Sequence, residues 1–423
     1  MRVLVIGGGG REHAIVRALA RSRHEPELLC APGNPGIGAD AELLDIGVDD
    51  IEAIVTAARA RAVDLVVVGP EAPLVAGLVD ALGEAGIAAF GPSAAAAQLE
   101  GSKVYAKEAM AAAGVPTAGH AVVGDREQAL THLAACEYPV VLKADGLAAG
   151  KGVIIAADEA EARAAIEAFF TERRFGATSV LIEEHLLGAE LSLLAICDGD
   201  NVVALAPAQD YKRIFDGDEG PNTGGMGSYS PVPGIDAAVV ERIVATVHAP
   251  VVALMAERGI PFHGVLYAGL MMTADGPRVL EFNCRFGDPE TQAVLPRMGS
   301  DLLDLCRAAG ERGGLAGTTA EFTDEWAVTL VLASRGYPES SSKGDVISGL
   351  GAAAATGAEI THAGTAERDG EIVTAGGRVL NVTALGPDAD AARRRAYDAA
   401  ERISFDGRQI RTDIAARAVA PAD

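Results

Sequence analysis

The sequence contains very little lysine. Only six of its 35 basic residues are lysine, and the other 29 are arginine. Because the chain uses arginine by default, each position that keeps a compact ammonium group is a candidate for a specific role. These positions are Lys103, Lys107, Lys143, Lys151, Lys212 and Lys343.

Positive charge as a whole is also scarce. The 59 acidic residues outnumber the 35 basic ones, which gives a formal net charge of −24. A protein with this charge repels a polyanionic backbone at long range, so a general nucleic-acid-binding function is excluded. A small anionic ligand is still compatible with the sequence, because a local cluster of cations can oppose the overall field.

Cysteine-based sites and membrane segments are not indicated either. The five cysteines form no C-x-x-C pair and no Cys/His cluster with zinc-ligand spacing. No apolar run approaches the roughly 18 residues of a membrane helix, and the N-terminus lacks the architecture of a signal peptide. We therefore expect a cytoplasmic protein that has no membrane partner, and we expect it to be a monomer.

The length of 423 residues suggests two to four domains. Short runs of Val, Ile and Leu alternate with Ala-rich helical stretches over the first hundred residues. This alternation predicts a doubly wound parallel sheet with helices on both faces. The strands are expected at 3–6, 27–30, 65–68 and 87–90, and the helices at 12–21, 51–60 and 75–85.

The first strand is followed by a glycine-rich turn, Gly7–Gly10, and then by Arg11. A dinucleotide-binding G-x-G-x-x-G motif needs a third glycine at position 12 or 13, where this chain has Glu12 and His13. The second strand also lacks a terminal acid that could bind a ribose hydroxyl. The turn could still bind a phosphate through backbone N–H groups, or it could be a tight turn without a ligand.

A second glycine-rich loop, Asp145–Gly152, lies between two predicted strands. It differs from a Walker A loop because three residues separate Gly146 from Gly150 and because Gly152 takes the place of Ser or Thr. The preceding strand ends at Lys143, and Lys151 lies within the loop. This combination favours a hairpin that covers the phosphates of a nucleotide.

An apolar strand over 180–183 ends in carboxylates, with Glu190 a few residues further on. The acids could simply be solvated at the end of a strand. Alternatively, the segment is an adenine-binding hinge, in which the backbone near His185 and Leu186 meets the base and Glu190 binds the ribose.

The stretch 279–290 is the most informative part of the sequence. Alternate residues of a strand share a face, so Glu281 and Asn283 present a carboxylate and an amide oxygen side by side. Such hard oxygen ligands suit magnesium that is also bound by phosphates. Arg285 lies on the same face if the strand continues, where it could stabilise a transferring phosphoryl group or hold a substrate carboxylate. Cys284 is expected to point into the core.

Two further segments complete the set, 209–213 and 220–227, and the second is a long loop of small residues that is too polar for the core. Unhindered backbone N–H groups in the second segment could receive an anion.

With these residues assembled, the chain resembles the phosphoribosylamine–glycine ligase family of the ATP-grasp superfamily. The resemblance covers essentially the whole chain, and two segments, 220–227 and 281–290, are specific to this family within the superfamily. The other matching motifs lie at 9–13, 69–75, 98–103, 143–152, 267–271, 280–291, 362–365 and 376–380.

The resemblance implies an α/β and α+β multidomain fold. Residues 1–101 would form a parallel-sheet domain on the phosphoribosylamine side. Residues 102–315 would form the ATP-grasp domain, with a mobile flap subdomain at about 116–187. Residues 320–423 would form a small mixed α/β domain.

The resemblance also implies a reaction and its cofactors. ATP, glycine and 5-phosphoribosylamine would give glycinamide ribonucleotide, ADP and phosphate through a glycyl phosphate, in the synthesis of purines. The expected cofactors are ATP and Mg²⁺, or Mn²⁺ in its place. The segment 265–272 contains none of the additional acidic metal ligands that many ATP-grasp enzymes carry there, which leaves the number of metal ions open.

Site residues follow from the same resemblance. The expected catalytic residues are Lys143, Asp210, Lys212 and Arg285, and the expected metal ligands are Glu281 and Asn283. The ATP site would comprise Lys103, Lys143, Gly146, Gly150, Lys151, Gly152, Glu183, Glu184, His185, Leu186 and Glu190. The substrate region would comprise Gly9, Gly10, Arg11, Glu71, Asn222, Thr223, Gly224, Gly225, Met226, Asp288 and Glu290.

Three alternatives remain beside this interpretation. One is another ATP-grasp carboxylate–amine ligase, or a carboxylase, that acts on a different ribonucleotide. Another is a nucleotide sensor without catalysis, which would not need the Glu281 and Asn283 pair beside Arg285. The third, a nicotinamide dehydrogenase, is disfavoured by the incomplete glycine motif.

Overall fold

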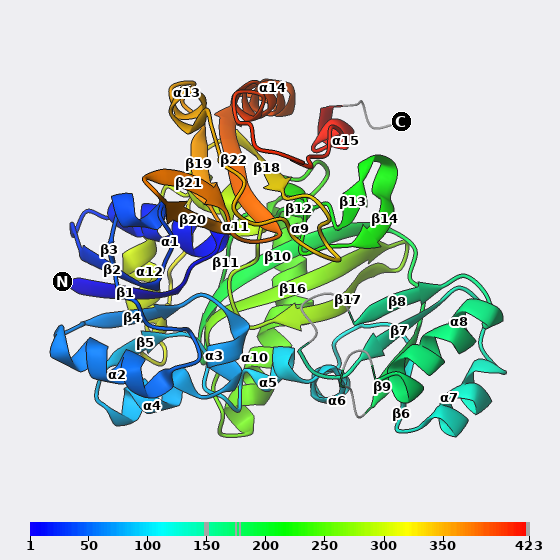
Figure 1. Cartoon of the computed structure of the whole chain (residues 1–423). Helices are drawn as coiled ribbons and strands as arrows, with labels where there is room; N and C mark the ends of the chain where they lie inside the picture. The colour runs from blue at the N-terminus through cyan, green and yellow to red at the C-terminus, as the bar shows by residue number, and fades with distance from the viewer. Residues whose placement is uncertain (148–151, 174–175, 177–178, 420–423) are drawn as a thin grey trace.

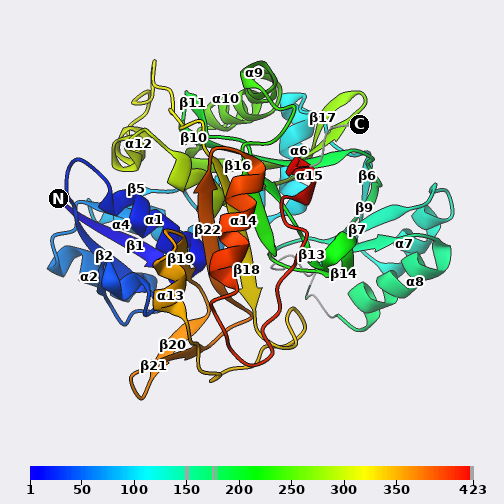
Figure 2. The same ribbon diagram turned by 90° about the horizontal axis from the view of Figure 1, so that it is seen from above.

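The computed structural model describes residues 1–147, 152–173, 176 and 179–419 (Figure 1). Four sheets of four or five strands organise this part of the chain. The N-terminal sheet and the flap sheet lie at opposite ends of the molecule, and the central and C-terminal sheets lie between them (Figures 1 and 2). Parallel pairing is found in the N-terminal sheet, and the other three sheets are antiparallel.

The N-terminal sheet has the strand order β3-β2-β1-β4-β5, with all neighbours parallel. Its first strand is buried on both faces, because Val3 and Val5 pack into one hydrophobic cluster and Leu4 and Ile6 pack into another. The prediction of a doubly wound parallel sheet is therefore confirmed. The elements are β1 (Arg2–Gly7), α1 (Gly10–Ala20), β2 (Glu27–Pro32), β3 (Glu42–Leu43), α2 (Ile51–Ala60), β4 (Leu65–Val68), α3 (Glu71–Val75), α4 (Leu78–Glu84) and β5 (Ala88–Phe90).

Helix α6 (Lys103–Ala113) leads from this domain into the next and follows the short helix α5 (Gln98–Gly101). Its start is fixed by Ser102, whose hydroxyl accepts a hydrogen bond from the backbone N–H of Tyr105 at 3.1 Å. Its end is fixed by Gly114, which has a φ of 68°. The helix places Lys103 and Lys107 one turn apart on the same side.

The central sheet has the order β11-β10-β16-β17. Strand β17 pairs with β16 so that Glu281 lies opposite Gly269 and Asn283 lies opposite Tyr267. The strands are β10 (Ala189–Asp198), β11 (Val202–Ala204), β16 (His263–Thr273) and β17 (Gly276–Asn283).

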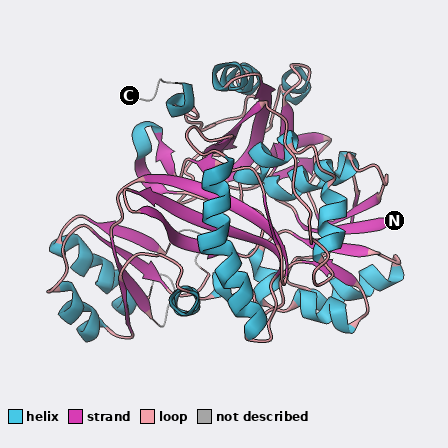
Figure 3. Cartoon of the chain, turned by 180° about the vertical axis from the view of Figure 1, so that it is seen from behind, coloured by secondary structure: helices cyan, strands magenta, loops and turns pink. Residues whose placement is uncertain are grey.

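A long apolar helical stretch lies across one face of this sheet (Figure 3). It consists of α9 (Ala237–Ile243), the π-helical turn Val244–His248 and α10 (Ala249–Glu257). By length and composition alone this stretch could cross a membrane, with a mean hydropathy of 1.6. The expectation that no segment would reach this threshold was therefore wrong, because many Ala and Val residues offset the charges of Glu241 and Arg242. Its buried residues pack into the cluster formed with the central sheet, as in the core helix of a globular protein.

The flap sheet has the order β6-β9-β7-β8 and is antiparallel throughout. Strands β7 and β8 form the predicted hairpin, and residues 148–151 of its loop lie outside the described part of the chain. The elements are β6 (His120–Val123), α7 (Arg126–Leu133), β7 (Val140–Ala144), β8 (Val153–Ala156), α8 (Glu159–Ile166), the π-helical turn Glu167–Thr171 and β9 (Val180–Glu184).

The C-terminal sheet has the order β12-β15-β18-β22-β19 and is covered by helix α14 (Figure 2). Strands β12 (Gln209–Asp210) and β15 (Gly227–Ser230) come from the segment assigned by sequence to the ATP-grasp domain. The substrate-region loops are thereby attached to the C-terminal sheet. The other elements are β13 (Arg213–Phe215), β14 (Glu219–Asn222), α11 (Glu290–Val294), α12 (Leu302–Ala309), β18 (Trp326–Ala333), α13 (Leu350–Ala354), β19 (Glu359–His362), β20 (Thr365–Arg368), β21 (Glu371–Thr374), β22 (Arg378–Gly386), α14 (Ala389–Ala400) and α15 (Ala416–Val419).

Two histidines join the N-terminal and C-terminal domains. The Nδ1 atom of His13 accepts a hydrogen bond from the backbone N–H of His362 at 2.8 Å, and the two rings are 5.9 Å apart. Burial, with smaller contributions from His13 and Arg17, lowers the pKa of His362 to about 4. His362 therefore stays neutral in the folded protein over a pH range in which an unfolded histidine is protonated.

We expect this interface to weaken in mild acid. The stabilisation is present above pH 6.5 and is lost as the pH falls towards 4, because protons then bind preferentially to the unfolded chain. From the two pKa values of His362, the loss between pH 7 and pH 5 is about 2 kcal/mol in the free energy of unfolding. Urea unfolding at both pH values should show a smaller pH dependence for His362→Gln than for the unsubstituted protein. A His362→Gln variant with the full pH dependence would contradict this account.

Candidate active site

A cavity of about 800 Å³ lies where the four sheets meet. It is lined by the N-terminal turn that holds Glu71, by Lys143 of the flap sheet, by Glu281 of the central sheet and by Arg378 of the C-terminal sheet. Its volume is suited to a nucleotide together with a second small molecule. The geometry therefore brings together residues that are up to about 400 positions apart in the sequence, from Arg11 to Arg417.

One end of the cavity carries three of the six lysines. The Nζ atom of Lys103 donates to the carbonyl oxygen of Gly146 at 2.9 Å. The Nζ atoms of Lys107 and Lys143 lie 3.1 and 2.9 Å from the two carboxylate oxygens of Glu183. Burial lowers the pKa of Lys103 and of Lys107. Such a concentration of cations in an acidic protein is suited to polyphosphate.

The hinge between the flap sheet and the central sheet lines the adjacent wall. Glu184, His185 and Leu186 all line the cavity, as does Leu187, which is 77% exposed. The carboxylate of Glu184 accepts hydrogen bonds from the N–H of Gly119 and from Arg278, both at 2.8 Å. It thereby links the segment that enters the flap sheet, at Gly119, to the segment that leaves it, at Glu184.

Strand β17 ends in the predicted constellation. Glu281 and Asn283 both line the cavity, and Cys284 on the opposite side is 1% exposed in the core, as predicted. Arg285 donates to Oδ1 of Asn283 at 3.1 Å and to the carbonyl oxygen of Phe286 at 3.0 Å. Arg285 therefore contacts Asn283, and all three predicted residues line the same cavity.

Two carboxylates hold Arg285 in place. Its guanidinium lies 3.0 Å from Glu71 and 3.0 Å from Glu100. Burial opposes the ionisation of Glu71, but the charges of Arg285 and Arg11 outweigh it and lower the pKa of Glu71 to about 2. Burial also raises the pKa of Glu100, whose other oxygen accepts from the N–H of Cys284 at 2.7 Å. These two carboxylates form a clamp that fixes the guanidinium just beyond the end of β17, which carries Glu281 and Asn283.

A further polar group lies towards the C-terminal sheet. Tyr267 and Ser192 both donate to Oε1 of Glu290, at 3.0 and 3.1 Å. Nearby, Lys212 bridges Glu190 and Asp210, at 2.5 and 2.9 Å. Burial raises the pKa of Asp210, and the two carboxylates raise the pKa of Lys212 against its own burial. This part of the cavity is rich in carboxylates and can receive an ammonium or amine group.

The loop 222–224 forms the adjoining wall, and Arg378 fixes it. The guanidinium of Arg378 donates to the carbonyl oxygens of Gly224 and Asp288, at 2.5 and 2.8 Å, and to the carboxylate of Asp288 at 3.0 Å. A Cβ atom at Gly224 would lie 3.0 Å from the guanidinium carbon of Arg378, so a larger residue there would displace the guanidinium by a few tenths of an ångström. Asn222 and Thr223 line the cavity beside it.

Several predicted substrate residues lie outside the lining of this cavity. The N–H of Gly9 donates to Glu12 at 2.7 Å, and Gly10 lies directly against Asn381 of the C-terminal sheet. Met226 is fully buried among apolar residues, and Gly225 lies against Pro289. Arg11, in contrast, lines the cavity and lies 3.9 Å from Glu71. Gly150 and Lys151 lie outside the described residues, whereas Gly146 and Gly152 line the cavity.

The predicted site residues omit eight residues that line the cavity with charged or phenolic groups: Glu100, Lys107, Tyr211, Arg213, Asp218, Tyr267, Arg378 and Arg417. Tyr211 and Arg213 lie in the segment 209–213 but were given no role, and no motif pointed to Asp218 or Arg417. Glu100, Tyr267 and Arg378 lie within motifs that match the family, but no role was predicted for them. Lys107 was flagged by the scarcity of lysine but was given no role. The signal for Lys107 was thus available in the composition, whereas the clamp made by Glu100 depends on a contact across 185 residues.

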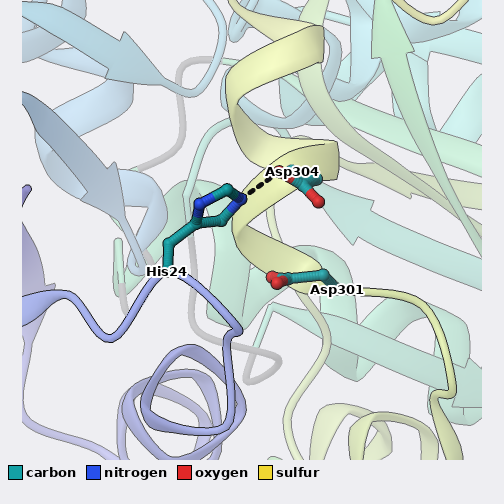
Figure 4. Close-up of side chains that lie close together, drawn as sticks. All are labelled: His24, Asp301 and Asp304. Carbon is teal, nitrogen blue, oxygen red and sulfur yellow. Dashed lines mark hydrogen bonds and ion pairs between the residues drawn. The ribbon is translucent and has the colours of Figure 1, made fainter.

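A second group of possible metal ligands lies far from this cavity, at His24, Asp301 and Asp304 (Figure 4). Its ligand atoms lie within 4.8 Å of one another. The carboxylate of Asp301 already accepts from Ser22, from the N–H of Arg23 and from the N–H of Leu303 at the start of α12. Asp304 pairs with His24 at 2.7 Å and with Arg23 at 2.6 Å. These contacts explain the group as a junction between α12 and the N-terminal domain.

Comparison with known proteins identifies the architecture. Family models of phosphoribosylglycinamide synthetase match the chain in order, with the N domain at residues 1–100, the ATP-grasp (A) domain at 101–291 and the C domain at 327–417. The phosphoribosylamine–glycine ligase of Streptomyces coelicolor is 52% identical over 99% of both chains. The ligase of Rhizobium meliloti is 50% identical, again over 99% of both chains.

Solved structures agree with these relatives. The crystal structure of phosphoribosylamine–glycine ligase from Thermotoga maritima is 36% identical, has a TM-score of 0.84 and is matched over 98% of this chain and 100% of that one. The biotin carboxylase domain of 2-oxoglutarate carboxylase from Hydrogenobacter thermophilus is 19% identical with a TM-score of 0.72, over 97% of this chain and 91% of that one. This second likeness shows the ATP-grasp fold alone.

The predicted multidomain fold with an ATP-grasp domain is thereby confirmed. An ATP-grasp domain binds ATP, and the full-length relatives are carbon–nitrogen ligases that take part in purine biosynthesis. The chain belongs to the phosphoribosylamine–glycine ligase family of ATP-grasp enzymes.

Proposed function

We propose that this enzyme joins glycine to 5-phosphoribosylamine and converts ATP to ADP and phosphate in doing so. The product is glycinamide ribonucleotide. The observation that carries this proposal is a single cavity with cations at one end, the Glu281, Asn283 and Arg285 group in the middle and a carboxylate-rich wall at the other end. The family membership supplies the substrates.

The reaction proceeds in two steps. A carboxylate oxygen of glycine attacks the γ-phosphorus of ATP, so that ADP leaves and glycyl phosphate forms. The amine of 5-phosphoribosylamine then attacks the glycyl carbonyl carbon, the carbon–oxygen bond to phosphate breaks and the amine loses a proton. Most of the catalysis comes from positioning the reactants and from neutralising charge.

The cavity residues support a role for each end. Lys103 and Lys143 would contact the phosphates of ATP, with Gly146 and Gly152 of the hairpin loop over them and Gly150 and Lys151 in the same loop. The hinge residues Glu183–Leu186 and Glu190 would hold the adenosine. Exclusion of water by the hairpin would protect an acyl phosphate from hydrolysis.

The donor set at the end of β17 fits a magnesium ion, with manganese as a substitute. The carboxylate of Glu281 and the amide oxygen of Asn283 are hard oxygen ligands on one face of the strand, and phosphate oxygens and water would complete the shell. When bound, the ion would neutralise charge on the phosphates. Arg285 would add a fixed positive charge beside the phosphates. Because the nucleophile is the carboxylate of glycine, no water molecule has to be activated.

The second half of the reaction would use the opposite wall. Asp210, Lys212, Asp288 and Glu290 would hold glycine and the amine, with residues 222–226 forming the loop beside them. Arg11 and Glu71, with the turn at Gly9 and Gly10, would lie on the phosphoribosyl side. We further propose a monomeric enzyme in the cytoplasm, with no nucleic-acid or membrane partner.

The test is the release of ADP with glycine and freshly prepared 5-phosphoribosylamine, with each component omitted in turn. We expect release only in the complete mixture with a divalent metal. Turnover with another acceptor, and none with glycine, would instead indicate a different ATP-grasp ligase or a carboxylase. Nucleotide binding without turnover under all these conditions would indicate a sensor.

A further inference from the structure

Glu183 is a buried carboxylate at the nucleotide end of the cavity. It is only 3% exposed, on strand β9, and its two oxygens are each paired with a lysine: Lys107 at 3.1 Å and Lys143 at 2.9 Å. A buried carboxylate is costly unless it is paired, so at least one of these ammonium groups is required for Glu183 itself. One carboxylate between two ammonium groups leaves one net positive charge.

The two lysines differ in how many of their N–H groups are engaged. An ammonium group has three N–H donors. Lys107 donates to Thr117 Oγ1 at 2.7 Å and to the carbonyl oxygen of Ala118 at 3.5 Å, besides its ion pair with Glu183. Lys143 donates to the carbonyl oxygen of Leu280 at 2.9 Å, besides its own ion pair with Glu183. Among the described residues, Lys143 therefore donates one hydrogen bond fewer than Lys107 and has more capacity left for a ligand.

The surroundings fix Lys107 firmly. It projects from α6 and is 3% exposed. Its partner Thr117 donates in turn to the carbonyl oxygen of Val279 on β17 at 2.6 Å. The ammonium group is therefore held between α6, β17 and the segment 117–118 that leads into the flap sheet.

We propose that Lys107 is a positioning residue for the nucleotide: it neutralises Glu183, so that the charge of Lys143 is available to the phosphates. Lys107 acts through Glu183 and does not itself touch ATP. The inference rests on the proposed function in one respect, namely that Lys143 faces the phosphates.

The alternative is a purely structural tie between α6, β9 and β17. The two roles differ in what they predict for ligands with and without phosphates. A charge effect weakens binding of ADP but not of adenosine, whereas a distorted site weakens both. The roles also differ in a double variant, since removal of Glu183 together with Lys107 frees Lys143 again.

The experiment measures binding of ADP with Mg²⁺, and of adenosine, by calorimetry on the full-length protein. The variants are Lys107→Met, Glu183→Gln, the double variant Lys107→Met with Glu183→Gln, and Lys343→Met as a control. Lys343 is exposed in the C-terminal domain. Because the readout is binding, the result does not depend on whether glycine and 5-phosphoribosylamine are the substrates; failure of the ligase assay alone would leave this test intact.

We expect Lys107→Met to weaken binding of ADP about tenfold, which corresponds to about 1.4 kcal/mol, and to change binding of adenosine less than about twofold. Once the charge of Glu183 is removed, the loss of Lys107 should matter little, so the double variant should bind ADP within about threefold of Glu183→Gln. If Lys107→Met does not fold, the comparison of Glu183→Gln with the double variant decides the question, because residue 183 carries no charge in either protein. Equal weakening of both ligands, no weakening by Lys107→Met, or a double variant that binds ADP about tenfold more weakly than Glu183→Gln would overturn the proposal.

Discussion

Replacing Glu281 with alanine should abolish turnover while the protein remains folded. Glu281 provides the carboxylate of the only pair of hard oxygen ligands that β17 presents to the cavity within the described chain, beside Arg285. Charge neutralisation by a metal carries much of the catalysis of phosphoryl transfer, so we expect kcat to fall by at least about a thousandfold. The measurement is the rate of ADP release at saturating ATP, glycine and 5-phosphoribosylamine over a series of magnesium concentrations.

The matched control lies at the other end of the same hairpin. Asp275 is an exposed acid in the turn between β16 and β17, and Asp275→Ala should leave kcat within about twofold of its original value. Circular dichroism and thermal unfolding establish that both variants are folded. Near-normal activity of Glu281→Ala at high magnesium would refute the assignment of Glu281 as a metal ligand.

Replacing Arg285 with lysine should cost about a hundredfold in kcat/KM, or about 2.7 kcal/mol. Lysine keeps the positive charge but cannot reach Glu71, Glu100 and Asn283 at once, as the planar guanidinium does. The charge would then no longer be held beside the reacting phosphoryl group. Steady-state kinetics with each substrate varied in turn would measure the loss.

The control for Arg285→Lys is Arg307→Lys, at an exposed position on α12. The effect on kcat, compared with the effect on the melting temperature, distinguishes a catalytic role of Arg285 from a structural one. We expect kcat to account for most of the loss, since the guanidinium would interact most strongly with the transferring group. An unchanged kcat, accompanied only by a lower melting temperature, would show that Arg285 does no more than join the N-terminal and central units.

Local patterns were sufficient to predict much of the fold. Strands β1, β2 and β4 are short apolar runs that are largely buried, and they lie within a residue or two of their predicted positions, as does β5. The exposed two-residue strand β3 was not predicted. The facing of Glu281 and Asn283 also followed from the two-residue period of a strand. Such features depend on residues that are neighbours in the sequence.

Features that depend on distant contacts could not be predicted in this way. Strands β12 and β15 join the C-terminal sheet although a hundred residues separate β15 from β18. The clamp on Arg285 needs Glu71 and Glu100 from another domain, and its strength comes from burial, which no local pattern reveals. The apolar helical stretch Ala237–Glu257 was misjudged for a related reason, since only its packing identifies it as a core helix.

The most direct test of the central claim follows the carboxylate oxygens of glycine. Glycine labelled with ¹⁸O in its carboxylate is incubated with ATP, 5-phosphoribosylamine and the enzyme, and the inorganic phosphate is analysed by mass spectrometry. An oxygen of glycine that attacks the γ-phosphorus stays with that phosphorus when the amine displaces phosphate. We therefore predict one ¹⁸O atom in each phosphate released and one in each molecule of glycinamide ribonucleotide. Phosphate without the label, formed while the ribonucleotide accumulates, would contradict the account.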